Sequence, residues 1–302
     1  MNGVLIIDKP PGLTSHDVVN RARRILQQRS IGHLGTLDPM ATGVLPLVTG
    51  TLTRLAQFYT ASEKIYEGTV RFGFATNTYD AEGDPITTPQ TVSLRAEDVE
   101  AVAGHFRGVL DQMPPPFSAK KINGVPAYKL ARKQHEVMLK PVQVEIKEFV
   151  ILGVEVDRAR FRARVASGTY MRSIAHEMGR ELGCGAHLES LRRTSVAEFN
   201  LGDAHTLEEI ASAAAAPGSL SLDDLFIHPR KLLPQFPCVT ADETTVARIR
   251  SGRTVNLPDL SRARQVKVFS GQKELIAIAT RVAGTLFHPK IVLCGAEAPV
   301  RL

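Results

Sequence analysis

Residues 32–43 read GHLGTLDPMATG, and they lie within a longer stretch, residues 31–50, that is rich in glycine and proline. Both residue types interrupt helical patterns and favour sharp turns or a close approach of the backbone to another group. The stretch is therefore predicted to be a loop, and long ordered loops commonly carry function. It holds one carboxylate, Asp38, and one imidazole, His33. Taken alone, Asp38 is more simply a turn residue, because Asp-Pro starts turns readily, and His33 an ordinary loop histidine.

The segments before this stretch predict a strand and a helix. Residues 3–8 are an apolar run typical of a short buried strand, and the prolines and glycine after it predict a turn. Thr14 and Asp17 have the spacing of a capping box, and the apolar residues between positions 18 and 26 share one helical face. Four arginines lie largely off that face and are interpreted as solvated charges, with phosphate contact as the minority alternative: Arg21, Arg23, Arg24 and Arg29.

The segments after it alternate between strand and helix patterns. Polar and apolar residues alternate from Tyr66 to Phe74 and again across 142–165, as in half-buried strands. An amphipathic helix is predicted from Thr169 to Gly183. Because these elements lack βαβ regularity, we expect an α+β fold with a mixed or antiparallel sheet and flanking helices. Four arginines share one face of the second strand region, which requires an anion, water or acidic neighbours, and a solvated face is favoured: Arg158, Arg160, Arg162 and Arg164.

Positive charge is concentrated in two places. Residues 231–302 hold 11 Lys and Arg against 5 Asp and Glu, which equals the net charge of +6 of the whole chain. The same region predicts one short helix and several strands in a compact α+β or barrel-like module. Residues 105–140 carry seven basic and two acidic residues and are a candidate phosphate-facing insert. Both features indicate a polyanionic partner, although a merely soluble basic domain explains the C-terminal excess equally well.

Composition and absent motifs exclude several classes of protein. The 302 residues are 43% hydrophobic and 23% charged, as in ordinary globular proteins. The chain shows neither a membrane-spanning apolar run nor a signal peptide, so a cytoplasmic location is expected. Motifs for nucleotide, dinucleotide or zinc-hydrolase chemistry are missing, which favours a mechanism without cofactor or metal. Three widely separated cysteines fit buried thiols better than a disulfide framework: Cys184, Cys238 and Cys294.

Five segments, in order along the chain, carry a family resemblance. They are DKPPGLTSHDVV near the start, GHLGTLDPMATGVLP, KIYEGTVRFGFATNTYDAEG, PPPFSAKKINGVPAYKLAR and SGTYMRSIAHEMGRELGCGAHLESLRR. Together they span most of residues 1–193, and they resemble the motifs of the TruB-type pseudouridine synthases. The resemblance implies a catalytic domain over residues 1–232, with the RNA-contacting insert at about 105–140. It also implies a PUA-like α/β-barrel RNA-binding domain over 233–302.

The resemblance also implies roles for individual residues. Asp38 would be the catalytic carboxylate and Arg172 its ionic partner. Tyr66 would lie against the target ring and is the candidate for the group that removes a proton. Residues implied to bind the uridine or the RNA around it are His33, Tyr170 and Leu191. Lys9 matches a motif residue whose role looks structural.

The implied reaction is the isomerisation of uridine 55 to pseudouridine in the T-arm loop of tRNA, after the base is flipped out. It needs no cofactor, and the resemblance implies a monomer without an obligatory protein partner. One alternative is a non-catalytic RNA-binding or tRNA-folding module, a role that an active enzyme could also combine with catalysis. A second is a guide-RNA-dependent relative that modifies ribosomal RNA within a particle. The chain lacks a long lysine-rich tail and an N-terminal extension, which favours the stand-alone enzyme.

Overall fold

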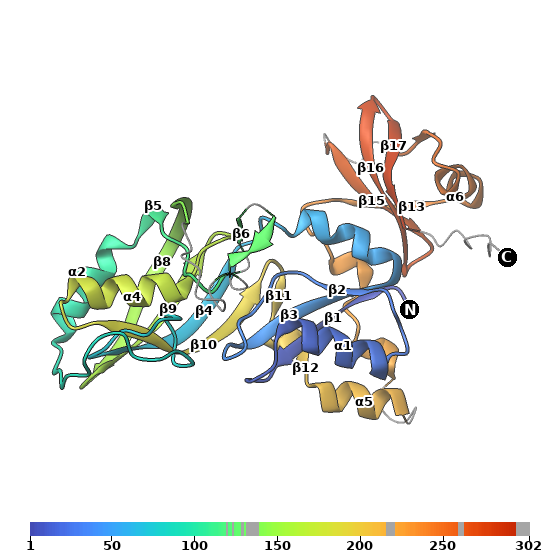
Figure 1. Cartoon of the computed structure of the whole chain (residues 1–302). Helices are drawn as coiled ribbons and strands as arrows, with labels where there is room; N and C mark the ends of the chain where they lie inside the picture. The colour runs from blue at the N-terminus through green and yellow to red at the C-terminus, as the bar shows by residue number, and fades with distance from the viewer. Residues whose placement is uncertain are drawn as a thin grey trace.

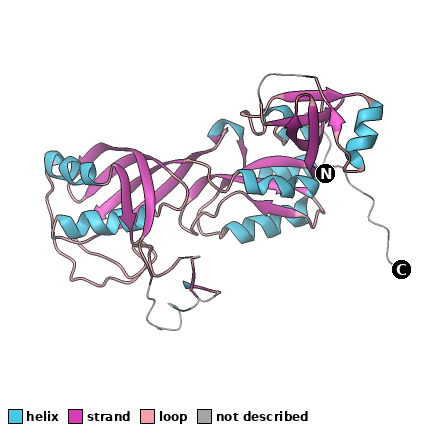
Figure 2. Ribbon diagram, turned by 90° about the horizontal axis from the view of Figure 1, so that it is seen from above, coloured by secondary structure: helices cyan, strands magenta, loops and turns pink. Residues whose placement is uncertain are grey.

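The protein consists of a long twisted sheet and a smaller C-terminal sheet placed beyond one of its ends (Figure 1, Figure 2). The computed structural model describes residues 1–118, 120–122, 124–127, 130, 139–215, 221–258 and 263–293. The expectation of an α+β fold with a mixed, mainly antiparallel sheet is confirmed, and the second sheet is consistent with a PUA-like module. Among the described helices, none is both long and apolar enough to cross a membrane.

The large sheet runs in the order β12-β1-β3-β10-β4-β9-β8-β5, with β11 paired to β10 and β2 paired to β3. Most neighbours are antiparallel, but β1 with β12 and β3 with β10 are parallel. The strands are β1 (Gly3–Lys9), β2 (Ile31–His33), β3 (Thr42–Thr49), β4 (Lys64–Phe72), β5 (Gly108–Gln112), β8 (Val142–Glu155), β9 (Arg158–Val165), β10 (Ala186–Val196), β11 (Phe199–Asn200) and β12 (Ala204–His205). The short strands β6 (Lys121–Ile122) and β7 (Val125–Pro126) form a separate pair.

Four helices of the described residues cover this sheet: α1 (Ser15–Ile25), α2 (Ala96–His105), α4 (Met171–Glu181) and α5 (Leu207–Ala215). The capping box predicted for α1 is present, because Thr14 Oγ1 accepts from Asp17 N at 3.0 Å and Asp17 Oδ2 accepts from Thr14 N at 3.0 Å. Helix α4 packs on β10, and α1 packs on α5 and β2. The short 3-10 helices are η1 (Gly50–Phe58), η2 (Leu201–Asp203), η3 (Leu222–Leu225) and η4 (Pro229–Lys231).

The prediction that residues 31–50 form one loop is wrong in part. They contain β2 and β3, and only residues 34–41 connect them. Pro46 sits inside β3 opposite Ile6, and its carbonyl accepts from Leu34 N at 2.9 Å. Tertiary pairing with β1 on one side and β2 on the other therefore overrides the local preference of proline. The expected close approach is real at Gly43, where a Cβ would lie 2.2 Å from the carbonyl oxygen of Arg193 in β10.

The arginine face of β9 is neutralised largely by acidic neighbours. Arg158 pairs with Glu189 at 2.9 Å, and Arg164 pairs with Glu63 at 2.7 Å. Arg162 pairs with Glu148 at 2.5 Å, while Arg160 is exposed. The favoured expectation of a merely solvated face is thus replaced by ion pairs at three of the four positions, two of them to other strands and one to Glu63 in the loop before β4.

The smaller sheet has the order β13-β15-β16-β17-β14 and carries helix α6 (Glu243–Arg250). Its strands are β13 (Cys238–Ala241), β14 (Val255–Asn256), β15 (Gln265–Ser270), β16 (Glu274–Ala283) and β17 (Leu286–Val292). Cys184 is buried and Cys238 half-buried, and both are free thiols, whereas Cys294 lies outside the described residues.

The two sheets share one hydrophobic cluster. Val4 and Val48 of the large sheet belong to the same buried cluster as Phe269 and Ile278 of the small sheet. The segment that leads from the large sheet into the small one is also fixed by hydrogen bonds, because the buried Lys267 of β15 donates to the carbonyls of Arg230 and Leu232. The smaller sheet is therefore packed against the larger one and not merely tethered to it.

Candidate active site

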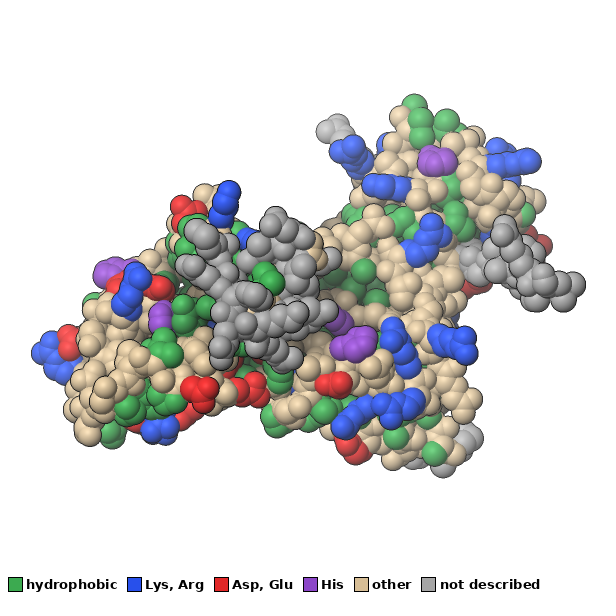
Figure 3. Space-filling model, in the orientation of Figure 1, with side chains coloured by type: hydrophobic (Ala, Val, Ile, Leu, Met, Phe, Trp, Pro, Cys, Tyr) green, Lys and Arg blue, Asp and Glu red, His purple; other side chains and the backbone are tan. Residues whose placement is uncertain are grey.

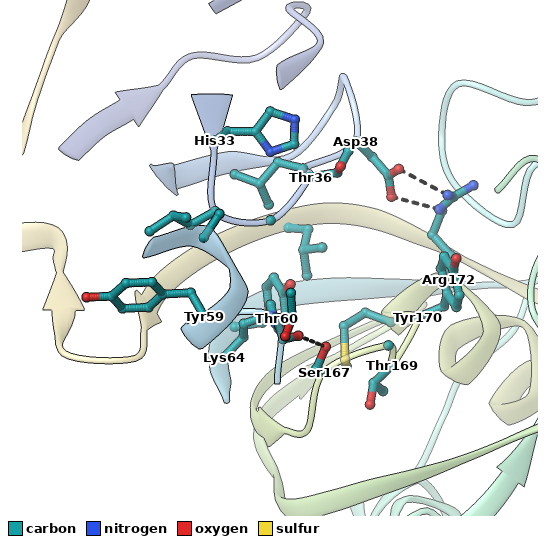
Figure 4. A pocket seen from close by; sticks show the side chains of 18 residues that line it. His33, Thr36, Asp38, Tyr59, Thr60, Lys64, Ser167, Thr169, Tyr170 and Arg172 are labelled. Carbon is teal, nitrogen blue, oxygen red and sulfur yellow. Dashed lines mark hydrogen bonds and ion pairs between the residues drawn. The ribbon is translucent and has the colours of Figure 1, made fainter. Parts of the chain in front are cut away.

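One cavity, of about 430 Å³, lies where the loop 34–41 meets β4, β10 and the start of α4 (Figure 4). It is lined by all six residues predicted for catalysis or uridine binding: His33, Asp38, Tyr66, Tyr170, Arg172 and Leu191. These residues come from positions far apart in the sequence, so the fold brings the predicted site together. A volume of this size is typical of small-ligand sites.

Asp38 and Arg172, which both line the cavity, form a bidentate ion pair (Figure 4). Arg172 Nε lies 2.9 Å from Asp38 Oδ2, and Arg172 Nη2 donates to Asp38 Oδ1 at 3.1 Å. The Arg172 side chain is 5% exposed, whereas the Asp38 side chain is 34% exposed. The carboxylate is thus held from the protein side and open on the cavity side.

Arg172 is itself fixed by several other partners. As the second residue of α4 it lies beside the buried apolar face of that helix. Its Nη1 donates to the Thr78 carbonyl at 3.1 Å, and its Nη2 donates to the Phe117 carbonyl at 3.0 Å. The carboxylate of Asp80, 5% exposed, lies 3.6 Å from Nη1. No local signal in the sequence marked Asp80 as a partner of Arg172.

The loop that carries Asp38 is anchored by two buried polar residues that precede it in the sequence. Lys9 is fully buried, and its Nζ donates to the carbonyls of Pro10 and Pro39, at 2.9 and 3.0 Å. Burial lowers the pKa of Lys9 to about 8. The buried Ser15 exchanges hydrogen bonds with the Leu37 backbone, at 3.1 Å to the carbonyl and 2.8 Å from the amide. The structural role expected for Lys9 fits this contact beside Asp38.

Arg193 anchors the same loop from the sheet and was not anticipated. It is 0% exposed, and its guanidinium donates to the carbonyls of Gly35, Thr36 and Val44 at 2.8 to 3.2 Å. None of the described carboxylates forms an ion pair with it. A buried cation satisfied by carbonyls alone fixes the path of the loop, because each lost hydrogen bond would leave a buried polar group without a partner.

Tyr66 points from β4 into the cavity and is 7% exposed. Its backbone pairs with Arg193 on one side and Ala163 on the other, so its position is fixed by a central strand. Within the described chain its hydroxyl has no hydrogen-bond partner. The phenol is therefore available to a bound substrate.

Tyr170 and Leu191 form another part of the cavity wall. The peptide groups of Tyr170 are clamped by the buried Gln112, which accepts from Tyr170 N at 2.8 Å and donates to Tyr170 O at 3.0 Å. Burial raises the pKa of the Tyr170 phenol, which keeps it protonated at neutral pH. Leu191, 8% exposed, adds an apolar surface from β10.

His33 and Lys64 complete the cavity on the side away from Arg172 (Figure 4). The Nδ1 atom of His33 is buried with no partner among the described atoms, and burial lowers its pKa, so the imidazole is neutral near pH 7. Lys64, which sequence reasoning missed, donates to the Ser62 carbonyl at 2.7 Å, and burial lowers its pKa to about 8. A neutral ring, and a lysine without an ion-pair partner among the described residues, suit contacts to a base and to its phosphate.

This arrangement can place an ionised carboxylate against a flat, small polar ligand in a partly enclosed site. Residues able to hold a metal do not cluster anywhere in the described ranges. The part of the 105–140 insert that the structure describes includes β5 in the large sheet and Phe117 beside Arg172. The remainder of the insert, residues 119, 123, 128–129 and 131–138, lies outside the described residues.

Two family models match the chain. Residues 23–171 match the TruB family pseudouridylate synthase (N terminal domain), and residues 172–226 match the tRNA pseudouridylate synthase B C-terminal domain. The junction between the two matches falls inside α4, so Asp38 and Arg172 come from different matched segments. The ion pair joins the two parts into one site.

Curated relatives agree with these matches over nearly the full chain. The tRNA pseudouridine synthase B of Solibacter usitatus is 51% identical over 296 residues, which cover 97% of this chain and 100% of the relative. The protein of the same name from Geobacter sulfurreducens is 38% identical over 291 residues, covering 94% and 95%.

Solved structures show the same fold. A chain of the crystal structure of a Cbf5-Nop10-Gar1 complex superposes with a TM-score of 0.71 and 26% identity, covering 97% of this chain and 85% of that chain. A chain of the archaeal box H/ACA sRNP Nop10-Cbf5 complex gives a TM-score of 0.70 at 23% identity, which speaks for the fold alone. With the full-length relatives and the matched family models taken together, the chain belongs to the TruB family of pseudouridine synthases.

Proposed function

We propose that the protein isomerises uridine 55 in the T-arm loop of tRNA to pseudouridine, with Asp38 as the catalytic carboxylate. Full-length relatives named tRNA pseudouridine synthase B support the substrate and the reaction. The observation that carries the proposal is the Asp38–Arg172 pair, which faces a cavity of about 430 Å³.

The reaction needs a carboxylate but no oxidant or energy source. The C1′–N1 bond of uridine breaks, a C1′–C5 bond forms, the C5 proton leaves and N1 gains a proton, so atoms and electrons balance within the substrate. An ionised Asp38 either attacks C1′ or C6 or stabilises positive charge that develops on the ribose. Each of these routes requires the charged form of Asp38, which the guanidinium of Arg172 stabilises.

The other cavity residues take the roles of base and pocket. Tyr66 lies against the uracil ring and is the group we propose to remove the C5 proton, because its hydroxyl has no hydrogen-bond partner among the described residues and Tyr66 lines the cavity. A uridine within a stacked loop is out of reach, so the nucleotide must be flipped into the cavity. Tyr170 and Leu191 then line the ring, and His33 contacts the RNA at the point where the base leaves its stack.

The remaining parts of the chain fit an enzyme that acts alone on RNA. We assign residues 1–232 to the catalytic domain and 233–302 to a PUA-like RNA-binding domain, because the basic excess of the sequence lies in residues 231–302 and this region forms the separate smaller sheet. The protein would work in the cytoplasm as a monomer without an obligatory protein partner.

The variant Asp38→Asn tests the proposal because it keeps the shape of the side chain and removes its charge. With an unmodified tRNA transcript, carbodiimide-primer extension should detect pseudouridine at position 55 with the wild-type protein and none with the variant. Binding of tRNA should stay within a few fold. Turnover near the wild-type rate in the variant would show that the carboxylate is not catalytic. A wild-type protein that modifies no position would leave only the RNA-binding or tRNA-folding role.

A further inference from the structure

A cluster of arginines lies at the C-terminal half of α1, outside the cavity. Arg21, Arg24 and Arg29 are exposed and Arg23 is half-buried, and we call these four residues the α1 arginine patch. Figure 3 shows Lys and Arg side chains gathered over this helix on the face of the molecule that also displays histidine side chains. The patch contains four cations within nine residues.

The α1 arginine patch has no ion-pair partner among the described residues. Asp17, four residues before Arg21 on the same helix, interacts with Arg21 electrostatically, but its carboxylate is hydrogen-bonded by the backbone amide and hydroxyl of Thr14. By contrast, Arg158, Arg162 and Arg164 on β9 all have acidic partners. An uncompensated cluster creates a local positive potential that attracts phosphates.

Three arginines of the patch line a shallow surface hollow of about 430 Å³. Gln27 has a left-handed conformation with φ of 48°, which turns the chain back at the end of α1. Arg23 Nη2 donates to the Ile31 carbonyl at 2.9 Å and ties the returning chain to the helix. The hollow is lined only by guanidinium-bearing and amide side chains: Arg23, Arg24, Gln27, Gln28 and Arg29. Such donors suit the oxygens of phosphate groups.

Two segments connect the patch to the uridine cavity. Helix α1 begins at Ser15, which is hydrogen-bonded to Leu37 beside the catalytic loop, and it ends at Ile25, about 15 Å away at ~1.5 Å per residue. Strand β2 runs back from Ile31 to His33 at the cavity rim. The patch is thus close enough for one RNA molecule to reach both places.

A structural explanation covers only part of the patch. Cations in the last turn of a helix are stabilised by the helix dipole, and this accounts for Arg23 and Arg24. Arg21 lies one turn earlier and Arg29 lies beyond the helix end, so the dipole explains neither of them. It also does not explain a hollow lined by hydrogen-bond donors.

We propose that the α1 arginine patch binds the phosphate backbone of the tRNA outside the loop that contains the target uridine. This inference rests on the proposed function, because it assumes that a tRNA places a uridine in the cavity. The patch positions the substrate and takes no part in the chemistry. Its three exposed arginines should therefore affect affinity and KM but not kcat at saturating tRNA.

The test compares two triple variants that remove the same charge. Arg21→Gln/Arg24→Gln/Arg29→Gln removes the exposed part of the patch. Arg95→Gln/Arg160→Gln/Arg180→Gln removes three exposed cations elsewhere on the large-sheet domain, two of them already paired with Asp98 and Glu177. Equilibrium binding of a full-length tRNA transcript is measured against salt concentration for both variants and the wild type.

The patch variant should flatten the slope of log K against log[salt] by roughly 2 to 3, at about 0.7 to 0.9 per lost phosphate contact. The control variant should keep the wild-type slope, and both should keep the wild-type kcat, which also shows that they are folded. A patch variant with the slope of the wild type or the control would overturn the inference. The proposed function fails separately, namely when the wild-type protein leaves uridine 55 unmodified in the same transcript.

Discussion

Replacing Arg172 tests whether the ion pair organises the site. In Arg172→Met the cavity side of Asp38 remains, but Asp38 loses the hydrogen bond from Nη2 and the ion-pair contact with Nε. The Asp80 carboxylate, 5% exposed, also loses its cationic partner. The variant should therefore lose both stability and turnover. Arg172→Lys should recover the charge but not the geometry, because one ammonium cannot reach Asp38 together with the Thr78 and Phe117 carbonyls.

The expected size of the effect follows from burial. Breaking a buried ion pair by removing one partner costs about 3–5 kcal/mol, and the lower end applies because the Asp38 side chain is 34% exposed. Transition-state stabilisation should fall by at least ~2 kcal/mol, which is roughly a 30-fold loss in kcat/KM. Arg172→Lys should lie between the wild type and Arg172→Met in both measurements.

Arg192→Gln is a matched control. Arg192 pairs with Asp8 through two nitrogens at 2.8 and 3.1 Å, much as Arg172 pairs with Asp38, but its side chain is 41% exposed and lies outside the cavity lining. Losing such an exposed pair costs about 0–1 kcal/mol. Urea unfolding and single-turnover modification of a tRNA transcript measure stability and chemistry separately. A wild-type rate in Arg172→Lys, or an equal loss in the Arg192 control, would refute the role given to the pair.

Three further predictions concern a residue that anchors the loop, the proposed base and the C-terminal sheet. The pKa of Lys9 is about 8 in the folded protein and 10.5 in the unfolded protein, so between pH 7 and 9.5 the unfolded wild type binds more protons and the wild type gains stability as the pH rises. Lys9→Met lacks this gain, so in denaturant titrations its unfolding free energy should fall by about 2 kcal/mol relative to that of the wild type over this range. A difference that does not change with pH would contradict the prediction. Tyr66→Phe should reduce the single-turnover rate by at least ~100-fold and leave tRNA affinity nearly unchanged, and an undiminished rate would remove the phenol as base. Deleting residues 233–302 should lower solubility and thermal stability in a melting experiment, because Val4, Val48 and their neighbours in the shared cluster would be exposed; a truncated protein as stable as the full chain would show that the cluster contributes little.

Local signals in the sequence predicted local structure well. The capping box at Thr14 depends on residues three apart, and it forms as expected. Pro46 was misread because the pairing of β3 with β1 depends on residues some forty positions away. The partners of the β9 arginines also come from other strands and loops, so the sequence could state only that partners were required.

The Asp38–Arg172 pair and the residues around it show the same difference between what the sequence predicts and what only the fold reveals. Asp38 and Arg172 were predicted from motif resemblance, since 134 positions separate them and no periodicity links them. Asp80 and Arg193 lacked such a signal. The roles of both residues become visible only in the structure, where each is buried. A buried charge requires partners, and those partners show what the residue holds in place.

The hydrophobic cluster shared by the two sheets fixes the distance between the C-terminal sheet and the cavity. Since Phe269 and Ile278 are embedded in the same interior as Val4 and Val48, the basic C-terminal sheet cannot swing freely relative to the cavity that holds Asp38. Under the proposed function, a tRNA would then have to present its target uridine and its more distant phosphates at one fixed separation. An RNA whose stem is lengthened by a few base pairs could engage the cavity or the C-terminal sheet, but not both at once.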